Sequence, residues 1–252
     1  MTPAPMQRVT ESAASSSTAR AYDLIRSELG SGFVPSIYQV LAACPPALDA
    51  AVEVLPRVVA VARDADFPAR VCALVATELA AVDGGELRGT RALDDASRDV
   101  ILGYRSANPL NLLLALALLG TGVPEWPGVM TAVSVSAPAP TDANPSLEDE
   151  ITLAHGGVLL PGLWRDLLSI SSASDPWSEV RAFAADGSMP SVRAQVRALA
   201  EQVLHEGHLA TADGILGRPL PLEVPHLTWF PTGIATMIVE AEVLVSSSPT
   251  SQ

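Results

Sequence analysis

Aromatic residues are scarce in this chain, and cysteine is nearly absent. Phe, Trp and Tyr make up 4% of the 252 residues, and the two cysteines are Cys44 and Cys72. Aromatic and β-branched residues suit strands, so their shortage argues against a β-rich fold. The cysteines form no CxxC motif and each lies among Ala and Leu, so we predict two buried free thiols.

Positively charged residues are also few. The chain has 15 Lys and Arg against 28 Asp and Glu, for a net charge of -13, and its cations form no cluster. A surface this acidic repels phosphate backbones, which excludes nucleic acid as an expected partner. The first eighteen residues lack a hydrophobic signal core, and the apolar run Leu110–Leu119 is about half a membrane span. We therefore predict a soluble, cytoplasmic protein with no membrane partner.

Apolar residues are abundant at 48%, with Ala and Leu dominant, and this composition predicts an all-α fold. Apolar spacing, proline starts and glycine stops predict successive helices. They cover residues 19–29, 34–44, 45–64, 67–83, 92–104 and 108–119. We place the start of the last of these at NPLN, where Asn108 can accept a backbone hydrogen bond as the N-cap.

The pattern then starts again after a connection rich in Pro, Ser and Ala. GFVPSIYQVLAACPPALDAAVEVL aligns without a gap to GVLLPGLWRDLLSISSASDPWSEV, with an offset of 126 between Pro35 and Pro161 (161 − 35 = 126). The same offset pairs Tyr38 with Trp164. We predict two tandem helical repeats of about 120 residues, packed as a pseudo-dimer whose interface offers a ligand cleft.

This interpretation gives five segments. Residues 1–18 and 246–252 are expected to be disordered, 19–123 and 148–245 to be the repeats, and 124–147 to be the linker.

Three segments of the sequence are similar to a known family: LGSGFVPSIYQVLAACPPALDAA, YRSANPLNLLLALALL and LLPGLWRDLL. They resemble the group I (DehI-type) 2-haloacid dehalogenases, over a span from about Ala19 to Leu244. The resemblance implies an all-helical, two-repeat and often dimeric enzyme, here a candidate homodimer, without metal or organic cofactor. It implies an aspartate base in the second repeat that activates water. This water displaces halide directly from a small 2-haloalkanoic acid, and an asparagine in the first repeat positions it.

The resemblance places the pocket wall of the first repeat at Phe33, Pro35 and Ser36. The water-positioning asparagine falls on Asn108 or Asn111, and we prefer Asn108 because the following proline fixes its backbone at a helix start. The other amide, Asn111, then faces the substrate.

The second repeat departs from the family pattern. Alignment places the base at or next to Gly162, beside the substrate-binding candidate Trp164, and neither residue can take a proton from water. Asp166, one turn further on, and Asp175 are the substitutes. Their ordinary roles are an exposed charge for Asp166 and a helix N-cap for Asp175, since Asp175 aligns with Asp49.

Two functions therefore stay open. The chain is a cofactor-independent dehalogenase that uses Asn108 with Asp166 or Asp175, or it is an inactive paralogue that binds a small carboxylic acid or a protein partner. HEGH, residues 205–208, offers two imidazoles without a third ligand, so no metal site is predicted.

Overall fold

The computed structural model describes residues 6–83, 93–120, 123–131, 146–170, 174–210 and 227–246. Within these ranges the chain forms ten α-helices, one short 3-10 helix and no strand, which confirms the all-α prediction. The helices are α1 (Ser16–Leu29), α2 (Ser36–Leu41), α3 (Pro45–Asp64), α4 (Phe67–Asp83), α5 (Asp95–Leu119), α7 (Leu147–Ala154), α8 (Gly162–Ile170), α9 (Ser174–Ala185), α10 (Met189–Glu206) and α11 (Trp229–Ser246).

Local sequence explains several helix ends. The Ser15 hydroxyl accepts a hydrogen bond from Thr18 N–H at the start of α1, and Gly30 ends that helix in the left-handed conformation at φ +60°. Ser146 and Asp149 form a reciprocal capping box at the start of α7. These ends follow from residues a few positions apart, which is why the sequence predicts them.

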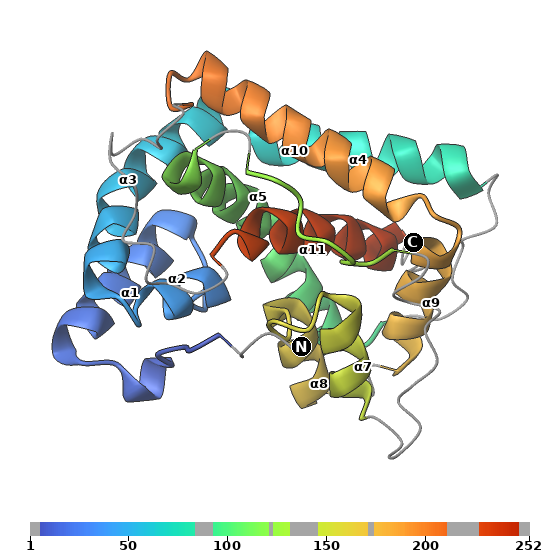
Figure 1. Ribbon diagram of the computed structural model, residues 1–252, viewed down its shortest axis with the longest axis horizontal. Helices are drawn as coiled ribbons and strands as arrows, with labels where there is room; N and C mark the ends of the chain where they lie inside the picture. The colour runs from blue at the N-terminus through green and yellow to red at the C-terminus, as the bar shows by residue number, and fades with distance from the viewer. Residues whose placement is uncertain are drawn as a thin grey trace.

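Two helices, α5 and α11, lie at the centre of the molecule and pack along each other (Figure 1). Helices α4 and α10 cover one side of this pair, α1 to α3 gather at one end, and α7 to α9 gather at the other (Figure 1). Trp164, Trp177 and Trp229 are fully buried. The few aromatic residues of the chain are thus concentrated in its core, where each buries a large apolar area.

The structure corrects the expected helix boundary at NPLN. Helix α5 runs without a break from Asp95 to Leu119, with Pro109 inside it, and Asp94 is its N-cap. Asn108 therefore lies in mid-helix and caps nothing. A proline inside a helix removes one backbone hydrogen bond and is usually a boundary, but burial of the apolar run that follows, Leu112–Leu118, offsets that cost.

The structure also corrects the expected disorder of the N-terminal segment over its described part. Residues 6–15, which we call the N-terminal strap, run from the end formed by α1 to α3 toward α8 (Figure 1). Val9 N–H donates to Gln39 O, Tyr22 Oη donates to Val9 O at 2.6 Å, and Met6 N–H donates to Val158 O. Met6 is buried. Composition alone predicts disorder for this segment, because it carries no information on hydrogen-bond partners that lie far away in the sequence. Residues 247–252 of the expected tail lie outside the described residues.

Part of the expected linker is also held in place. Within the described residues 123–131, Val129 and Met130 are buried, and two nearly buried arginines of α10 bind the backbone. Arg193 donates to Val129 O at 2.7 Å and Arg197 to Val123 O at 2.6 Å. These charge-assisted bonds fix the segment against α10.

Cys72 joins a polar cluster between the central helices rather than the apolar core. The Arg105 guanidinium of α5 donates two hydrogen bonds to the carboxylate of Glu242 on α11. Burial and a hydrogen bond to Glu242 raise the pKa of the Cys72 thiol to about 11. Both cysteines are free, as predicted, but each is partly exposed and not fully buried.

We expect Cys72 to alkylate slowly at pH 8. With its pKa at about 11, the reactive thiolate is scarcer than in an ordinary cysteine by about a hundredfold or more. The stability that this neutral thiol contributes is complete below the ordinary cysteine pKa and is lost as the pH rises toward 11. Iodoacetamide labelling followed by mass spectrometry, from pH 7 to 11, measures the rate. Labelling of Cys72 at the rate of the unfolded chain at pH 8 would contradict the assignment, and Glu242→Gln should accelerate labelling.

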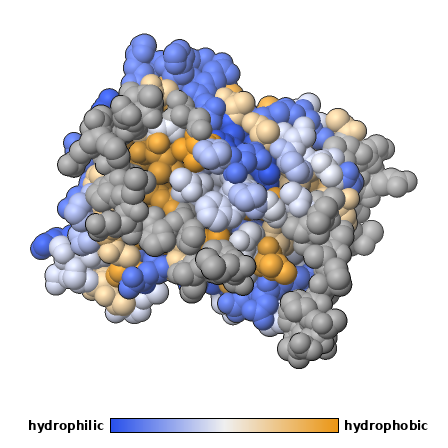
Figure 2. All heavy atoms as spheres, viewed as in Figure 1, coloured by the Kyte–Doolittle hydropathy of each residue, from blue (hydrophilic) through white to orange (hydrophobic). Residues whose placement is uncertain are grey.

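Helix α11 is long and apolar enough to cross a membrane by length and composition, but 89% of that window is buried inside the protein. On the face shown in Figure 2, hydrophilic side chains cover most of the coloured surface and hydrophobic ones gather in a few patches. The large exposed apolar residues, Leu24, Leu102, Leu153 and Ile170, come from four different helices. Exposed apolar residues scattered in this way are normal and indicate no particular partner.

Candidate functional site

A cavity lies where α2, α5, α11 and the start of α8 meet. Its volume is about 10 Å³, far below the roughly 300–1,000 Å³ of small-molecule sites. This volume is near the minimum that holds one water molecule. The lining residues are Pro35, Ser36, Ile37, Tyr104, Asn108, Asn111, Leu159, Pro161, Gly162, Trp229, Phe230, Ile234 and Met237.

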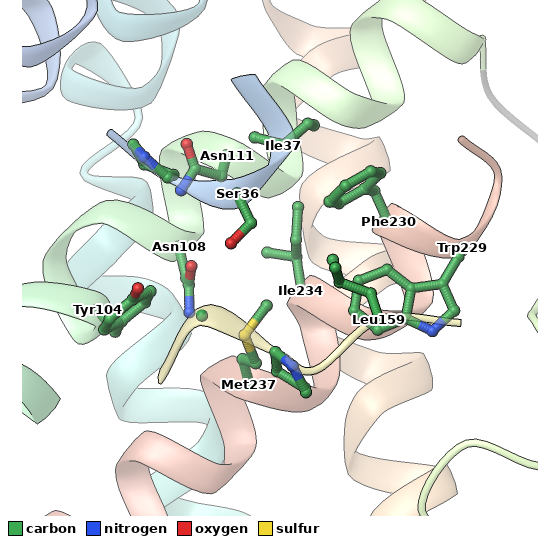
Figure 3. Close-up of a pocket in the computed structure, with 13 residues that line it drawn as sticks. Ser36, Ile37, Tyr104, Asn108, Asn111, Leu159, Trp229, Phe230, Ile234 and Met237 are labelled. Atoms are coloured by element: carbon green, nitrogen blue, oxygen red, sulfur yellow. The ribbon is translucent and has the colours of Figure 1, made fainter. Parts of the chain in front are cut away.

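Figure 3 shows how α2, α5 and α11 supply most of this lining. Tyr104, Asn108 and Asn111 come from α5, and Ser36 comes from α2. Ile234 and Met237 come from α11. Ser36 and Met237 are both buried.

Two buried amides are the most unusual groups of this lining. Asn108 is 2% exposed and Asn111 is 1% exposed. In the described part of the chain, Asn108 Nδ2 and Asn111 Oδ1 are buried without a hydrogen-bond partner. Leaving a buried polar atom unpaired costs roughly 1–3 kcal/mol. A water molecule, or a polar group of a ligand, that paired with one of these atoms would remove the cost at that atom.

Tyr104 connects the cavity to the charged pair of α8. Its hydroxyl donates to Asp166 Oδ2 at 2.8 Å, and Arg165 Nε donates to Asp166 Oδ1 at 2.8 Å. Arg165 Nη1 also donates to Ser36 Oγ at 3.3 Å. The Ser36 hydroxyl is the acceptor in this bond.

The charges around Tyr104 fix its protonation. Burial first, and then the nearby charge of Asp166, raise the pKa of the Tyr104 hydroxyl far above its ordinary value, so it stays a neutral donor. Burial opposes the charge of Arg165, but the hydrogen bond to Asp166 and the electrostatic attraction of Tyr104 and Asp166 together outweigh it, so the pKa of Arg165 rises. The Asp166 side chain keeps 29% of its surface exposed. A proton taken up by Asp166 can therefore leave to solvent.

The close approach of Tyr104 explains the glycine at position 162. A Cβ atom on Gly162 would lie 2.5 Å from the Tyr104 Oη and 3.1 Å from the Ser36 Oγ. A carboxylate at this position would therefore displace Tyr104, whose ring also packs on Phe33 at a centroid distance of 4.6 Å. The phenol occupies the place where the resemblance puts the catalytic aspartate.

The structure brings together some of the predicted site residues. Pro35, Ser36, Asn108, Asn111 and Gly162 all line the cavity. Asp166 lies behind Tyr104, and the two residues line a neighbouring surface groove of about 500 Å³.

The sequence predicts Phe33 and Trp164 in the wall of the cavity, but neither residue lines it. Phe33 lines the outer groove, because its ring packs on the outer side of Tyr104. Trp164 points into the core, where it packs edge-on against Trp177. Asp175 is the second residue of α9, so it does not precede the helix as an N-cap, and its side chain lies outside what the structure describes.

A second polar cluster is fully enclosed in the core. His155 Nε2 lies 2.9 Å from Glu240 Oε1, and Trp164 Nε1 donates to Glu240 Oε2 at 3.0 Å. His155 Nδ1 lies 2.7 Å from Ile151 O, so this nitrogen carries a proton, since a carbonyl can only accept. None of these residues lines the cavity. The cluster links α7, α8 and α11.

The histidines of HEGH lie at the end of α10, where His208 has a positive φ of 54°. Among the described residues no group of three His, Cys, Asp or Glu side chains is placed to hold a metal ion. His226 lies outside the described residues.

Sequence reasoning missed Tyr104 as a site residue. Residues 104, 108 and 111 have the spacing i, i+4, i+7, which places all three on one face of a helix. The signal was present, but Pro109 was interpreted as a helix boundary, and this separated Tyr104 from the two amides. Trp229 and Phe230 were missed because their contact with α5 is purely tertiary.

No family model, no curated protein and no solved structure matches this chain significantly. The relationship to the DehI-type dehalogenases therefore stays a prediction from the three segments.

Proposed function

We propose that this chain binds a small 2-substituted carboxylic acid at the cavity and hydrolyses it at C2 by direct attack of water. The observation that carries this proposal is the pair of buried amides, Asn108 and Asn111, with unpaired atoms beside a water-sized space. A water molecule there accepts a hydrogen bond from Asn108 Nδ2 and keeps a second lone pair for attack on C2. The acid widens the cavity by displacing the unbranched, flexible side chain of Met237.

A proton relay through Tyr104 then makes Asp166 the base, although Asp166 does not contact the attacking water molecule. As water attacks C2, one of its protons passes to the Tyr104 oxygen while the Tyr104 proton passes to Asp166 Oδ2. The new C–O bond forms as the carbon–halide bond breaks, and halide leaves with the bonding electrons. Asp166 then releases its proton to solvent. The phenol never carries a charge in this sequence, in agreement with its raised pKa.

A second candidate function is binding without turnover. Both carboxylate oxygens of Asp166 already accept hydrogen bonds, from Arg165 and Tyr104, and Asp166 does not line the cavity. Under this alternative the same cavity holds the acid but no water is activated.

We also propose that the two halves arose by duplication and pack as a pseudo-dimer. Pro35 and Ser36 at the start of α2 correspond to Pro161 and Gly162 at the start of α8, and all four line one cavity. The inner prolines Pro109 and Pro231 also correspond, with the offset of 122 that relates Pro68 to Pro190 (231 − 109 = 122; 190 − 68 = 122).

Halide release from the purified protein tests the hydrolytic function. The substrates are both enantiomers of 2-chloropropionate, and monochloroacetate. We expect Asp166→Asn to lower release by about 10²- to 10⁴-fold, the usual contribution of a general base. Asp99→Asn is the matched control, because Asp99 is exposed, lines the same outer groove and loses the same charge.

Three other outcomes are informative. Loss of release in Asp175→Asn with activity kept in Asp166→Asn would move the base to Asp175. Equal rates in all variants would contradict an aspartate base at either position. If a helical parent protein binds these acids but releases no halide, the second function is favoured.

A further inference from the structure

We propose that Arg8 and Arg165 together bind the carboxylate of the small acid, with Arg8 delivered by the N-terminal strap. This inference rests on the proposed function and assigns the groups that recognise the negative charge. In the described part of the chain, Arg8 Nη1 is buried and has no hydrogen-bond partner. A buried guanidinium N–H without an acceptor is costly, and an anion would satisfy it.

The charge balance around Arg8 also requires an anion. Arg8 lies within electrostatic reach of Arg165, Asp166 and Tyr104. Tyr104 is neutral, so two guanidinium groups face a single half-buried carboxylate. Glu148 also acts on Arg8, but it is exposed and water screens its charge. One uncompensated positive charge stays at this site in a chain whose net charge is -13.

The strap explains how Arg8 reaches the site. On one side of Arg8, Met6 N–H donates to Val158 O, just before α8. On the other side, Val9 N–H donates to Gln39 O in α2. Arg8 therefore lies between α2 and the segment that leads into α8. A ligand that bridges Arg8 and Arg165 would bind the strap to α8 and close the site.

A small monocarboxylate fits this place better than a larger anion. Its single charge equals the local excess, and its two oxygens match the two donors that a guanidinium presents side by side. Ser36 and Tyr104, which also contact Arg165, place this charge beside the cavity wall. The C2 atom of a carboxylate held here would lie next to the cavity.

Calorimetric titration of 2-chloropropionate and of neutral 2-chloropropionamide into Arg8→Gln tests the assignment. We expect the affinity for the carboxylate to fall about tenfold or more, as when a hydrogen bond to a charged group is lost, and the affinity for the amide to change less than twofold. Arg20→Gln is the matched control, because Arg20 is exposed on α1 and its loss changes the net charge equally. If the Gln variant fails to fold, Arg8→Lys keeps the charge but loses the paired donors, and we expect an intermediate affinity.

A second measurement separates this inference from the proposed function. Sodium acetate should raise the melting temperature of the parent more than sodium chloride of the same ionic strength, and Arg8→Gln should abolish the difference. Stabilisation by acetate that depends on Arg8, without binding of 2-substituted acids, keeps the carboxylate site and overturns the proposed function. Binding of 2-chloropropionate that is equal in parent and Arg8→Gln keeps the function and overturns the role of Arg8. Absence of both effects overturns both.

Discussion

Replacing Tyr104 with phenylalanine should lower halide release by about 10²- to 10⁴-fold while the acid still binds. The variant loses the hydroxyl that donates to Asp166 Oδ2, so the path from water to the carboxylate is broken. The ring remains, and with it the packing on Phe33 that closes the cavity wall. Initial rates of halide release, together with calorimetric affinity for 2-chloropropionate, separate a lost proton path from a lost site.

Tyr38→Phe is the matched control for this experiment. The Tyr38 hydroxyl is buried without a hydrogen-bond partner in the described part of the chain, and Tyr38 does not line the cavity. We expect its removal to leave halide release unchanged and to keep or slightly raise stability, since an unpaired buried hydroxyl contributes nothing. If Tyr104→Phe keeps more than half of the parent rate, the relay is wrong and Asp166 does not act through the phenol.

Replacing Glu240 with alanine should lower the free energy of unfolding by about 3–5 kcal/mol. Glu240 is completely buried, and its two oxygens are paired with His155 Nε2 and Trp164 Nε1. Alanine leaves both nitrogens without a partner and opens a cavity between α8 and α11. Urea unfolding followed by circular dichroism measures the loss.

Glu240→Gln identifies the charge state of this cluster. The glutamine oxygen can accept from Trp164, and its amide can donate to His155 Nε2 if the imidazole is neutral. We expect a loss of about 1 kcal/mol or less, the scale of one altered neutral hydrogen bond. A loss as large as that of the alanine variant would contradict this arrangement and assign a charged pair of imidazolium and carboxylate.

The fold class and most helix limits follow from short-range properties of the chain. These properties are the Ala and Leu content, the glycine at position 30 and the prolines at the starts of α3 and α10. Each acts within one or two helical turns, so the sequence alone predicts its effect. The prediction of a helix boundary failed at Pro109. There the local rule predicts a boundary, while packing of α5 against α11 holds one continuous helix. The position of a helix end depends on local residues only when tertiary burial does not outweigh them.

By itself, the sequence determined that the chain is helical and acidic, and which residues carry the two amides and the aspartates. Only the tertiary structure decided which of these groups meet. It placed Asn108 and Asn111 against one cavity, set Tyr104 between that cavity and Asp166, and brought Arg8 of the strap close to Arg165. The physical reason is sequence separation. Tyr104 and Asp166 are 62 positions apart, and contacts across such distances are fixed by packing of whole helices, which no local pattern encodes.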